Sequence, residues 1–267
     1  MNEHYYDEMI KSITSVNDKS RNIPLQYTGL NKKGGSTLAY EFEDPSTKER
    51  YYLKITPNED NGGGELRVLP KVNQLFRNEV LTEPDALKRL GYIPVPTIIT
   101  DDPSRFNQEF SNLFKPEESL LQLQTAAVGT HSERELPESI TDRLSILLSF
   151  AKLLRTCAKN KIAYVDIKPL EHLFWERHAG QIRITLIDWG IARANAEPAM
   201  LADDIRKFCQ TIPEVIYGKK MADLQYKGKL TYPIQSENRS ALIPLLSIFS
   251  FNSEMPPLST EIGRAHV

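Results

Sequence analysis

The sequence predicts an α+β fold in which a strand-rich N-terminal half meets a helix-rich C-terminal half. Short apolar and aromatic runs separated by Gly, Pro and Asn turns occupy residues 23–56 and predict a hairpin-rich start. A long amphipathic segment at residues 137–160 and a further helical segment at residues 199–216 dominate the second half. We expect the boundary between the halves at Thr125–Glu138.

Composition sets the broad class of the protein. The 267 residues carry a net charge of −2, with 40% hydrophobic and 25% charged residues, which suits one large domain or two lobes. This balance disfavours disordered, collagen-like and coiled-coil chains, and it gives no reason to expect nucleic acid as a partner. No apolar run approaches the about 20 residues of a membrane span, and no Sec-type signal is visible. We therefore expect a soluble, cytoplasmic protein with Cys157 and Cys209 as buried thiols.

The N-terminal elements follow from local patterns. Residues 1–22 predict a short helix and a polar linker, an extension that precedes the main domain. Helical periodicity appears over residues 66–81, where Pro70 is expected to break the helix, and again over residues 82–90. The strands are predicted at IPLQYTGL (23–30), TLAYEFED (37–44), RYYLKIT (50–56), VPTIITDD (95–102) and SLLQLQTA (119–126).

The C-terminal elements begin with the long helix over residues 137–160. Its apolar face is expected to contain Leu144, Leu147, Leu148, Ala151, Leu154 and Cys157. Short strands are predicted at KIAYVDIK (161–168), HLFW (172–175) and RITLID (183–188), before the second helix. The tail EIGRAHV (261–267) resembles the translation of a sequencing adapter, so we expect an artefact there and a natural protein that continues past about Thr260.

Two stretches in the N-terminal half could contact phosphate groups. Gly29, Gly34 and Gly35 lie in GLNKKGGST, where glycines let backbone N–H groups approach phosphates, although a plain hairpin turn is the alternative. Lys54 lies mid-strand among apolar neighbours, and its ammonium group needs an anion unless the side chain simply reaches the solvent. A helix carboxylate from Glu79 or Glu83 could pair with it.

Two aspartates flank a short predicted hairpin in the C-terminal half. Asp166 lies in YVDIKPLEHLFW and Asp188 lies in LIDWG. Folding back of the hairpin is expected to bring the two carboxylates near each other. Such a pair suits one acid that accepts a proton from a hydroxyl group and another that holds Mg²⁺.

In this order, the stretches resemble the eukaryotic-like protein kinase superfamily over roughly residues 23–210. VDIKP resembles the catalytic loop, IDWG the metal-binding turn and YYLKI the strand that carries the ATP lysine. The resemblance implies a two-lobed kinase fold with an antiparallel sheet and helix at residues 23–124 and a mainly helical lobe at residues 125–260. The "PVP" after the predicted helix and the short segment after IDWG resemble aminoglycoside-phosphotransferase-like kinases.

The resemblance implies roles for the C-terminal residues. Asp166 would orient or deprotonate the acceptor hydroxyl, and Lys168 would contact the γ-phosphate. Asp188 would hold Mg²⁺ between the phosphates. Glu171 falls where the family has a metal-binding asparagine, so it is expected as a metal ligand, with His172 as a packed neighbour. LADDIRKF (201–208) resembles the helix that carries a structural aspartate in compact kinases.

The resemblance also implies roles for the N-terminal residues. Lys54 would grip the α- and β-phosphates of ATP, with Glu83 as its expected helix partner and Glu79 as the alternative. Adenine is expected to lie against the hinge near Gln122–Ala126, with Gln124 and Ala126 as its binding residues.

The implied function is an ATP- and Mg²⁺-dependent Ser/Thr protein kinase, with Mn²⁺ as a possible substitute for Mg²⁺. A small-molecule kinase of the aminoglycoside or choline type is the first alternative, and a pseudokinase used as a binding module is the second.

Overall fold

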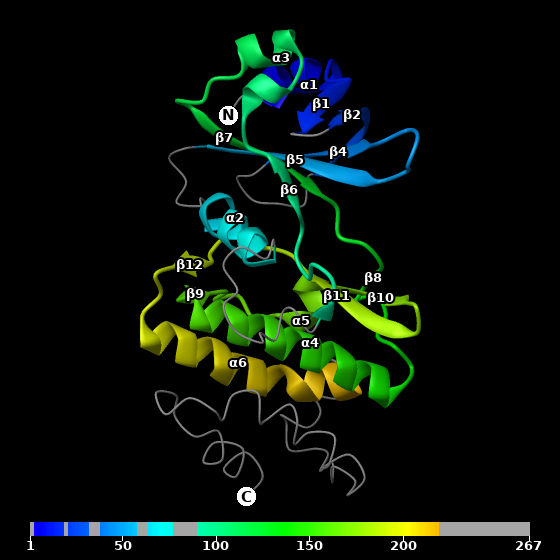
Figure 1. The fold of residues 1–267 in the computed structure, drawn as a ribbon, viewed down its shortest axis with the longest axis vertical. Coiled ribbons are helices and arrows are strands. Elements are labelled where there is room, and N and C mark those ends of the chain that lie inside the picture. Colours follow the sequence, from blue (N-terminus) through cyan, green and yellow to red (C-terminus); the bar gives the residue numbers. More distant parts are fainter. Residues whose placement is uncertain (1–2, 19–20, 32–37, 58–63, 77–89, 219–267) are drawn as a thin grey trace, which may run out of the picture. The chain divides into compact units, whose positions relative to one another are not determined.

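The computed structural model describes residues 3–18, 21–31, 38–57, 64–76 and 90–218. The chain divides into two compact units, unit 1 with residues 1–73 and 96–127, and unit 2 with residues 74–95 and 128–267 (Figure 1). The second break between the units, after residue 127, lies inside the predicted boundary Thr125–Glu138. Residues 74–95 belong to unit 2, whereas the sequence had assigned them to the strand-rich half. The observed mixture of antiparallel sheets and helices confirms the α+β class.

A five-stranded antiparallel sheet forms the frame of unit 1. The strand order is β3-β4-β5-β7-β6, so the central strand β5 pairs with β4 on one side and β7 on the other. The alternating sequences of β4, β5 and β7 explain why these strands form the middle of the sheet. The strands are β3 (Gln26–Asn31), β4 (Leu38–Glu43), β5 (Arg50–Pro57), β6 (Ile98–Thr100) and β7 (Ser119–Thr125).

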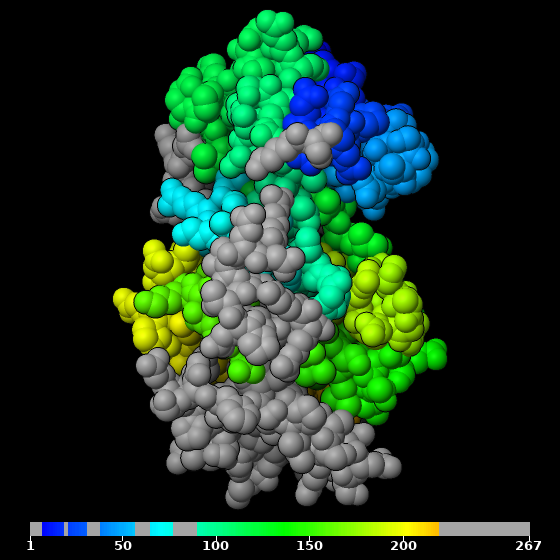
Figure 2. Space-filling model, viewed as in Figure 1, coloured from blue at the N-terminus to red at the C-terminus, as the bar shows by residue number. Residues whose placement is uncertain are grey.

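The N-terminal segment belongs to unit 1 and is more than a linker. After α1 (Glu3–Lys11), the predicted polar linker forms an antiparallel hairpin of β1 (Ser15–Asp18) and β2 (Arg21–Pro24). The hairpin is stable because Val16 and Ile23 are both buried. The short helices η2 (Pro103–Arg105) and α3 (Gln108–Leu113) complete this region. On the surface shown in Figure 2, dark blue atoms of the N-terminal segment lie directly beside the lighter blue atoms of β4 and β5.

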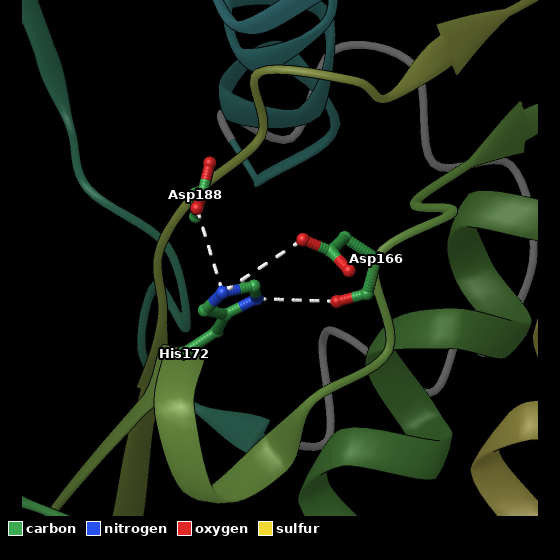
Figure 3. A group of neighbouring side chains, drawn as sticks. All are labelled: Asp166, His172 and Asp188. Atoms are coloured by element: carbon green, nitrogen blue, oxygen red, sulfur yellow. Dashed lines mark hydrogen bonds and ion pairs between the residues drawn. The ribbon is translucent and has the colours of Figure 1, made fainter. Parts of the chain in front are cut away.

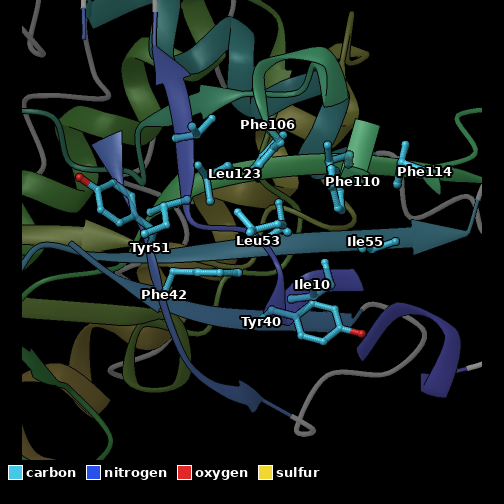
Figure 4. Packing of buried hydrophobic residues seen from close by; sticks show 14 of the residues in the cluster. Ile10, Tyr40, Phe42, Tyr51, Leu53, Ile55, Phe106, Phe110, Phe114 and Leu123 are labelled. Atoms are coloured by element: carbon cyan, nitrogen blue, oxygen red, sulfur yellow. The ribbon is translucent and has the colours of Figure 1, made fainter. Parts of the chain in front are cut away.

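The hydrophobic core of unit 1 lies between one face of the sheet and these N-terminal and α3 elements (Figure 4). Tyr40 from β4 is fully buried, and its hydroxyl group donates to Asp7 of α1 at 3.3 Å. Phe106, Phe110 and Phe114 form a row of packed rings with centroids 5.0 and 5.6 Å apart. Ile10 and Ile13 of the N-terminal segment and Val16 and Ile23 of the hairpin belong to the same core, and burial of each such side chain contributes roughly 1.5–3 kcal/mol, so α1 and the β1–β2 hairpin are part of the fold that holds the sheet.

Helix α2 (Gly64–Phe76) starts in unit 1 and continues through Pro70, where the sequence had predicted a break. Pro70 lies inside the helix, so α2 lacks the intrahelical hydrogen bond that an N–H group at this position would donate, yet the helix continues to Phe76. Asn73 of α2 donates to the carbonyl oxygen of Pro96 at 2.8 Å and accepts from the N–H of Ile98 at 3.2 Å. The helix predicted at residues 82–90 lies almost wholly outside the described residues.

Within its described residues, unit 2 has two long helices and two small sheets. The helices α4 (Ile140–Lys159) and α6 (Pro198–Tyr217) match the predicted segments. Strands β10 (Leu173–His178) and β11 (Gln181–Leu186) form a hairpin that β8 (Thr130–His131) extends, and β9 (Ile162–Ala163) pairs with β12 (Arg193–Ala194). One helical turn, α5 (Pro169–His172), leads directly into β10.

The core of unit 2 lies where α4 meets α6 and the hairpin. The predicted residues Leu147, Ala151, Leu154 and Cys157 are buried, whereas Leu144 and Leu148 are only half-buried. Phe150 of α4 packs edge-to-face on Phe208 of α6, with ring centroids 5.5 Å apart. These contacts fix α6 against α4, and α6 in turn supports the loop that follows β9.

The predictions on the two cysteines and on membrane spans can be compared with the structure. Neither Cys157 nor Cys209 forms a disulfide. Cys157 is buried as predicted, and this burial raises the pKa of its thiol, whereas Cys209 is only half-buried. No helix within the described ranges has both the length and the apolar character needed to cross a membrane.

Candidate functional site

The β10–β11 hairpin brings Asp166 and Asp188 together, as the sequence predicted. Asp166 precedes α5, and Asp188 follows the last residues of β11. The N–H of Ile187 donates to the carbonyl oxygen of His172 at 2.8 Å, which closes the two ends of this loop against each other. Asp188 has a φ of +59°, a left-handed conformation that aspartate tolerates better than most residues.

His172 lies between the two aspartates (Figure 3). Its Nε2 atom is 3.4 Å from Asp188 Oδ2 and 3.8 Å from Asp166 Oδ2. One ligand atom from each of the three residues lies within 4.8 Å of the others, so the group could hold a metal ion. His172 is buried, Asp166 is partly exposed and Asp188 is exposed, so the cluster opens to solvent at Asp188.

The structure places His172, and not Glu171, in the cluster with the two aspartates. The side chain in the cluster belongs to His172, whereas Glu171 is exposed and its carbonyl oxygen lies 2.7 Å from Nε2 of His131. Adjacent residues on a helical turn point about 100° apart, so only one of the two can face Asp188. The predicted metal ligand Glu171 was chosen by counting residues from Asp166, whereas the cluster in the structure contains the next residue, His172.

The other nitrogen of His172 has two oxygen neighbours. Nδ1 lies 3.1 Å from the hydroxyl oxygen of Tyr164 and 3.2 Å from the carbonyl oxygen of Asp166. The Tyr164 hydroxyl group donates to the carbonyl oxygen of Ile187 at 2.5 Å. Tyr164 itself is buried against the edge of Trp189, with ring centroids 4.8 Å apart. The imidazole ring is therefore held in place on the side away from the carboxylates.

Helix α6 fixes the loop that carries Asp166. Asp204 accepts hydrogen bonds from the N–H groups of Tyr164 at 2.6 Å and Val165 at 2.9 Å. Lys207 donates to the carbonyl oxygen of Val165 at 3.0 Å. Val165 has a φ of +73°, which is strained for a β-branched residue. Asp204 is thus the structural aspartate that LADDIRKF was expected to supply.

Two ionisable groups near the loop have shifted pKa values. Burial raises the pKa of Asp204 to about 6, although the two backbone N–H donors act in the opposite direction. A hydrogen bond to Asp166 raises the pKa of Lys168, whose Nζ atom lies 3.0 Å from Asp166 Oδ1. Lys168 is therefore a cation at neutral pH, and its position beside Asp166 leaves it half exposed.

Lys54 in unit 1 has a carboxylate partner that the sequence analysis did not name. Its Nζ atom lies 2.6 and 2.7 Å from the two carboxylate oxygens of Glu65, in the first turn of α2. The side chains are only 20% and 13% exposed, so water screens this pair weakly. The expected partners Glu79 and Glu83 lie outside the described residues. The position of Glu65 in the first turn of the helix that follows the Lys54 strand could have indicated it as the partner of Lys54.

The sheet face that carries Lys54 is polar, opposite to the hydrophobic core. Gln122 lies directly across from Lys54 in the β5–β7 register, so both side chains point to the same face. Gln122 and Gln124 are buried, and Gln122 Nε2 donates to Gln124 Oε1 at 2.7 Å. Among the described residues, Gln122 Oε1 is a buried acceptor without a hydrogen-bond partner. Gln122 is the first residue of the predicted hinge at Gln122–Ala126.

The other residues predicted to bind ATP are Ala126, Gly29, Gly34 and Gly35. The N–H of Ala126 donates to the carbonyl oxygen of Arg50 at 2.8 Å, so this donor already has an acceptor within the sheet. Gly29 lies in β3, where the register with β4 shifts between Tyr27 and Gly29. Gly34 and Gly35 lie outside the described residues, as does the tail at residues 261–267.

Comparison with known proteins adds no family to this description. No protein-family model matches the chain, and a search of curated proteins finds no match.

Proposed function

We propose that this chain is an ATP-dependent phosphotransferase that transfers the γ-phosphate to a hydroxyl group, with a Ser/Thr hydroxyl of a protein as the first candidate acceptor. The observation that supports this most strongly is the meeting of Asp166 and Asp188 at the ends of one loop. Phosphoryl transfer needs a carboxylate at the acceptor hydroxyl and a metal-binding carboxylate close to it. The resemblance to kinases assigned those roles to the same two residues.

The roles in unit 2 follow from the contacts. Asp166 accepts or orients the proton of the acceptor hydroxyl. The hydroxyl oxygen forms a bond to the γ-phosphorus while the bond between the γ-phosphorus and the oxygen that bridges to the β-phosphate breaks, and ADP leaves. Lys168 is a cation 3.0 Å from Asp166 and half exposed, so it suits contact with the transferring phosphate. A divalent ion at Asp188 and His172 would neutralise phosphate charge.

The role of unit 1 is phosphate binding through Lys54. Glu65 fixes the ammonium group of Lys54 by a two-oxygen contact, which limits where that cation can point. The buried acceptor Gln122 Oε1 on the same face suits a ligand that brings a hydrogen-bond donor, such as the exocyclic amino group of adenine. We therefore propose ATP as the phosphate donor.

A small-molecule acceptor is the second candidate. The segment between Asp188 and the start of α6 at Pro198 is short, and its only strand is the two-residue β12. Such a short segment offers little surface for an extended peptide. This feature favours an acceptor of the aminoglycoside or choline type.

The test is incubation with γ-labelled ATP and Mg²⁺ or Mn²⁺, with generic protein acceptors in one arm and aminoglycosides or choline in the other. Label on protein hydroxyls supports the first candidate, and label on a small molecule supports the second. Binding of ATP without transfer would instead favour a pseudokinase binding module, and it would contradict the proposed enzyme.

The variant that tests the site is Asp188→Asn. Asparagine tolerates the φ of +59° at this position, so the backbone should be unchanged while the metal-binding charge is lost. We expect transfer to fall by about a thousandfold or more, which is the upper range for removal of one stabilising group. Asp101→Asn removes a charge from an exposed aspartate after β6 and is the matched control. Equal activity of the two variants would refute the assignment.

A further inference from the structure

His172 offers a nitrogen atom to a cluster that the resemblance to kinases would fill with oxygen ligands only. The side chain is 9% exposed, and its Nε2 atom points toward both Asp166 and Asp188 (Figure 3). A buried imidazole between two carboxylates is an uncommon arrangement, because burial of a polar ring is costly unless both nitrogens have a role. Nδ1 has two oxygen neighbours that can take part in hydrogen bonds, whereas Nε2 faces the two carboxylates.

The neighbours of Nδ1 determine which nitrogen bears the hydrogen. The carbonyl oxygen of Asp166 can only accept a hydrogen bond. The Tyr164 hydroxyl group donates its hydrogen to Ile187, so toward His172 its oxygen can only accept as well. Nδ1 must therefore carry the hydrogen, and in the neutral ring Nε2 carries the lone pair. Metal-binding histidines in proteins are oriented in the same way, with the second nitrogen donating to a nearby oxygen.

The spacing of the atoms fits one ion. A tetrahedral ion with bonds of about 2.0–2.1 Å to nitrogen and oxygen places its ligand atoms about 3.3 Å apart. Nε2 lies 3.4 Å from Asp188 Oδ2 and 3.8 Å from Asp166 Oδ2, and all three ligand atoms lie within 4.8 Å of one another, so an ion would draw the two carboxylates inward to complete the site. Three protein ligands leave further coordination positions for phosphate oxygen or water.

The nitrogen ligand decides which ions the cluster prefers. Mg²⁺ and Ca²⁺ favour oxygen ligands, whereas imidazole suits divalent transition metals, whose affinities rise from Mn²⁺ to Co²⁺ and beyond. We infer that Asp166, His172 and Asp188 bind a divalent transition-metal ion with His172 Nε2 as a direct ligand and Asp166 bound through Oδ2 alone, which leaves Asp166 Oδ1 for the acceptor hydroxyl. This inference deepens the proposed function and rests on it for the ion's role in phosphate transfer, but the binding itself requires no nucleotide.

The experiment measures binding of CoCl₂, MnCl₂ and MgCl₂ to the nucleotide-free full chain by calorimetry, together with the visible absorption of bound Co²⁺. We expect Co²⁺ to bind at least about tenfold more tightly than Mg²⁺. In His172→Asn, an amide oxygen replaces the ring nitrogen. We expect Co²⁺ affinity to fall about 10–100-fold, while Mg²⁺ affinity changes by less than about threefold.

Two controls separate the ligand from its surroundings. His178→Asn removes an exposed histidine at the end of β10 and should leave Co²⁺ affinity unchanged. Glu171→Gln tests the residue that the sequence favoured, and it should change Co²⁺ affinity by less than about threefold because Glu171 lies outside the cluster. A large loss in Glu171→Gln with none in His172→Asn would overturn the inference.

A third variant keeps the test decisive if His172→Asn folds poorly. Tyr164→Phe removes the hydroxyl group beside Nδ1 but keeps the ring that packs on Trp189. We expect about a tenfold loss of Co²⁺ affinity, the typical effect of removing a group that orients a metal-binding histidine. Unchanged affinity and an unchanged Co²⁺ spectrum in this variant would contradict the inference.

The failures of the two proposals can be told apart. Co²⁺ binding that depends on His172, in a chain that transfers no phosphate to any acceptor, would refute the proposed function and leave this site standing. Phosphate transfer with Mg²⁺ by a chain whose Co²⁺ affinity does not depend on His172 would refute this site and leave the proposed function standing.

Discussion

The two charged sites of the molecule differ in how their charge is balanced. In unit 1, the cation Lys54 faces the anion Glu65 at 2.6 Å, and both side chains are largely shielded from water. In unit 2, the carboxylates of Asp166 and Asp188 lie around a histidine, and Lys168 is the cation in contact with Asp166. The first site is held by its own opposite charges. The second concentrates negative charge, which favours a cation from solution.

The difference also extends to what holds each site in position. Lys54 lies in a regular strand whose neighbours fix it by ladder hydrogen bonds. Asp166 and Asp188 lie in or next to residues with positive φ, at Val165 and Asp188, and the loop is held from outside by Asp204 and Lys207. A strained loop persists only when its surroundings over-determine it, so the supports in α6 should matter as much as the cluster itself.

The largest expected effect on stability comes from Asp204→Ala. This change removes the acceptor for two N–H groups, the buried one of Tyr164 and the half-buried one of Val165. Each buried donor without a partner costs about 1–3 kcal/mol, so the free energy of unfolding should fall by about 2–5 kcal/mol in denaturant titration. Phosphate transfer should fall with it because Asp166 follows Val165.

The neighbouring residue provides a matched control for that variant. Asp203 pairs with Arg206 and Lys207 on the surface of α6 and is 39% exposed. Asp203→Ala should cost less than about 1 kcal/mol, the usual effect of a surface ion pair. If the two alanine variants were equally stable, the loop would not depend on Asp204 as its support.

The second effect, in order of size, is the loss of the Lys54–Glu65 pair. Lys54→Met leaves Glu65 shielded from water without its cation, and we expect the free energy of unfolding to fall by about 1–3 kcal/mol. The double variant Lys54→Met/Glu65→Leu should recover most of that stability because the uncompensated charge is gone. Neither protein should show a thermal shift with ATP.

This cycle separates folding from ligand binding in unit 1. Recovery of stability without recovery of ATP binding would mean that the Lys54–Glu65 pair is needed for ATP binding, whereas an apolar pair at the same positions is enough for the stability of the fold. An ATP-dependent thermal shift in the double variant would contradict the proposed role of Lys54. The matched control is Lys48→Met, which removes a lysine from an exposed position in the β4–β5 turn.

The sequence predicted the parts of each site that depend on strand and hairpin patterns. Alternating runs identified the strand of Lys54, and the turn between two apolar segments correctly predicted that Asp166 and Asp188 would meet. Patterns failed where one residue of helical rotation decides the outcome. His172 rather than Glu171 faces the aspartates in the single turn of α5; Pro169 marks the start of this turn, but the sequence does not show which side of the turn faces Asp188.

The same limit applies to contacts across loops. Glu65 follows Lys54 across a Gly-rich stretch, and neither spacing nor periodicity indicates which acidic residue in or near the next helix returns to the strand. The N-terminal hairpin was missed because its alternation is short and mostly polar, and only its packing on the sheet makes it stable. Tertiary contacts decide both cases.

The next effect is a pH dependence that arises from Asp204. Burial raises its pKa to about 6 in the folded protein, above the usual value near 3.8 in the unfolded chain. The folded state therefore binds more protons between these values, and this residue's contribution to stability is complete below about pH 4 and lost as pH rises through about 6. Relative to Asp204→Asn, which cannot titrate, the wild type should lose about 2–3 kcal/mol between pH 4 and pH 7.

Denaturant titrations of both proteins at several pH values provide the measurement, because the other carboxyl groups cancel in the difference. A constant difference would mean that Asp204 keeps an ordinary pKa. An increasing difference, with the wild type gaining relative stability at higher pH, would mean that its two N–H donors outweigh the cost of burial.

The smallest effect tests the strain in the loop directly. Val165 has a φ of +73°, where a β-branched side chain crowds its own backbone and glycine does not. Val165→Gly should therefore raise the free energy of unfolding by about 0.5–1 kcal/mol, even though glycine makes the unfolded chain more flexible. Val165→Ala keeps a Cβ atom and should recover less. If Val165→Gly is the least stable of the three proteins, the backbone is not strained at Val165. Helix α6 then holds Asp166 in place through packing and does not have to offset the free-energy cost of a strained backbone.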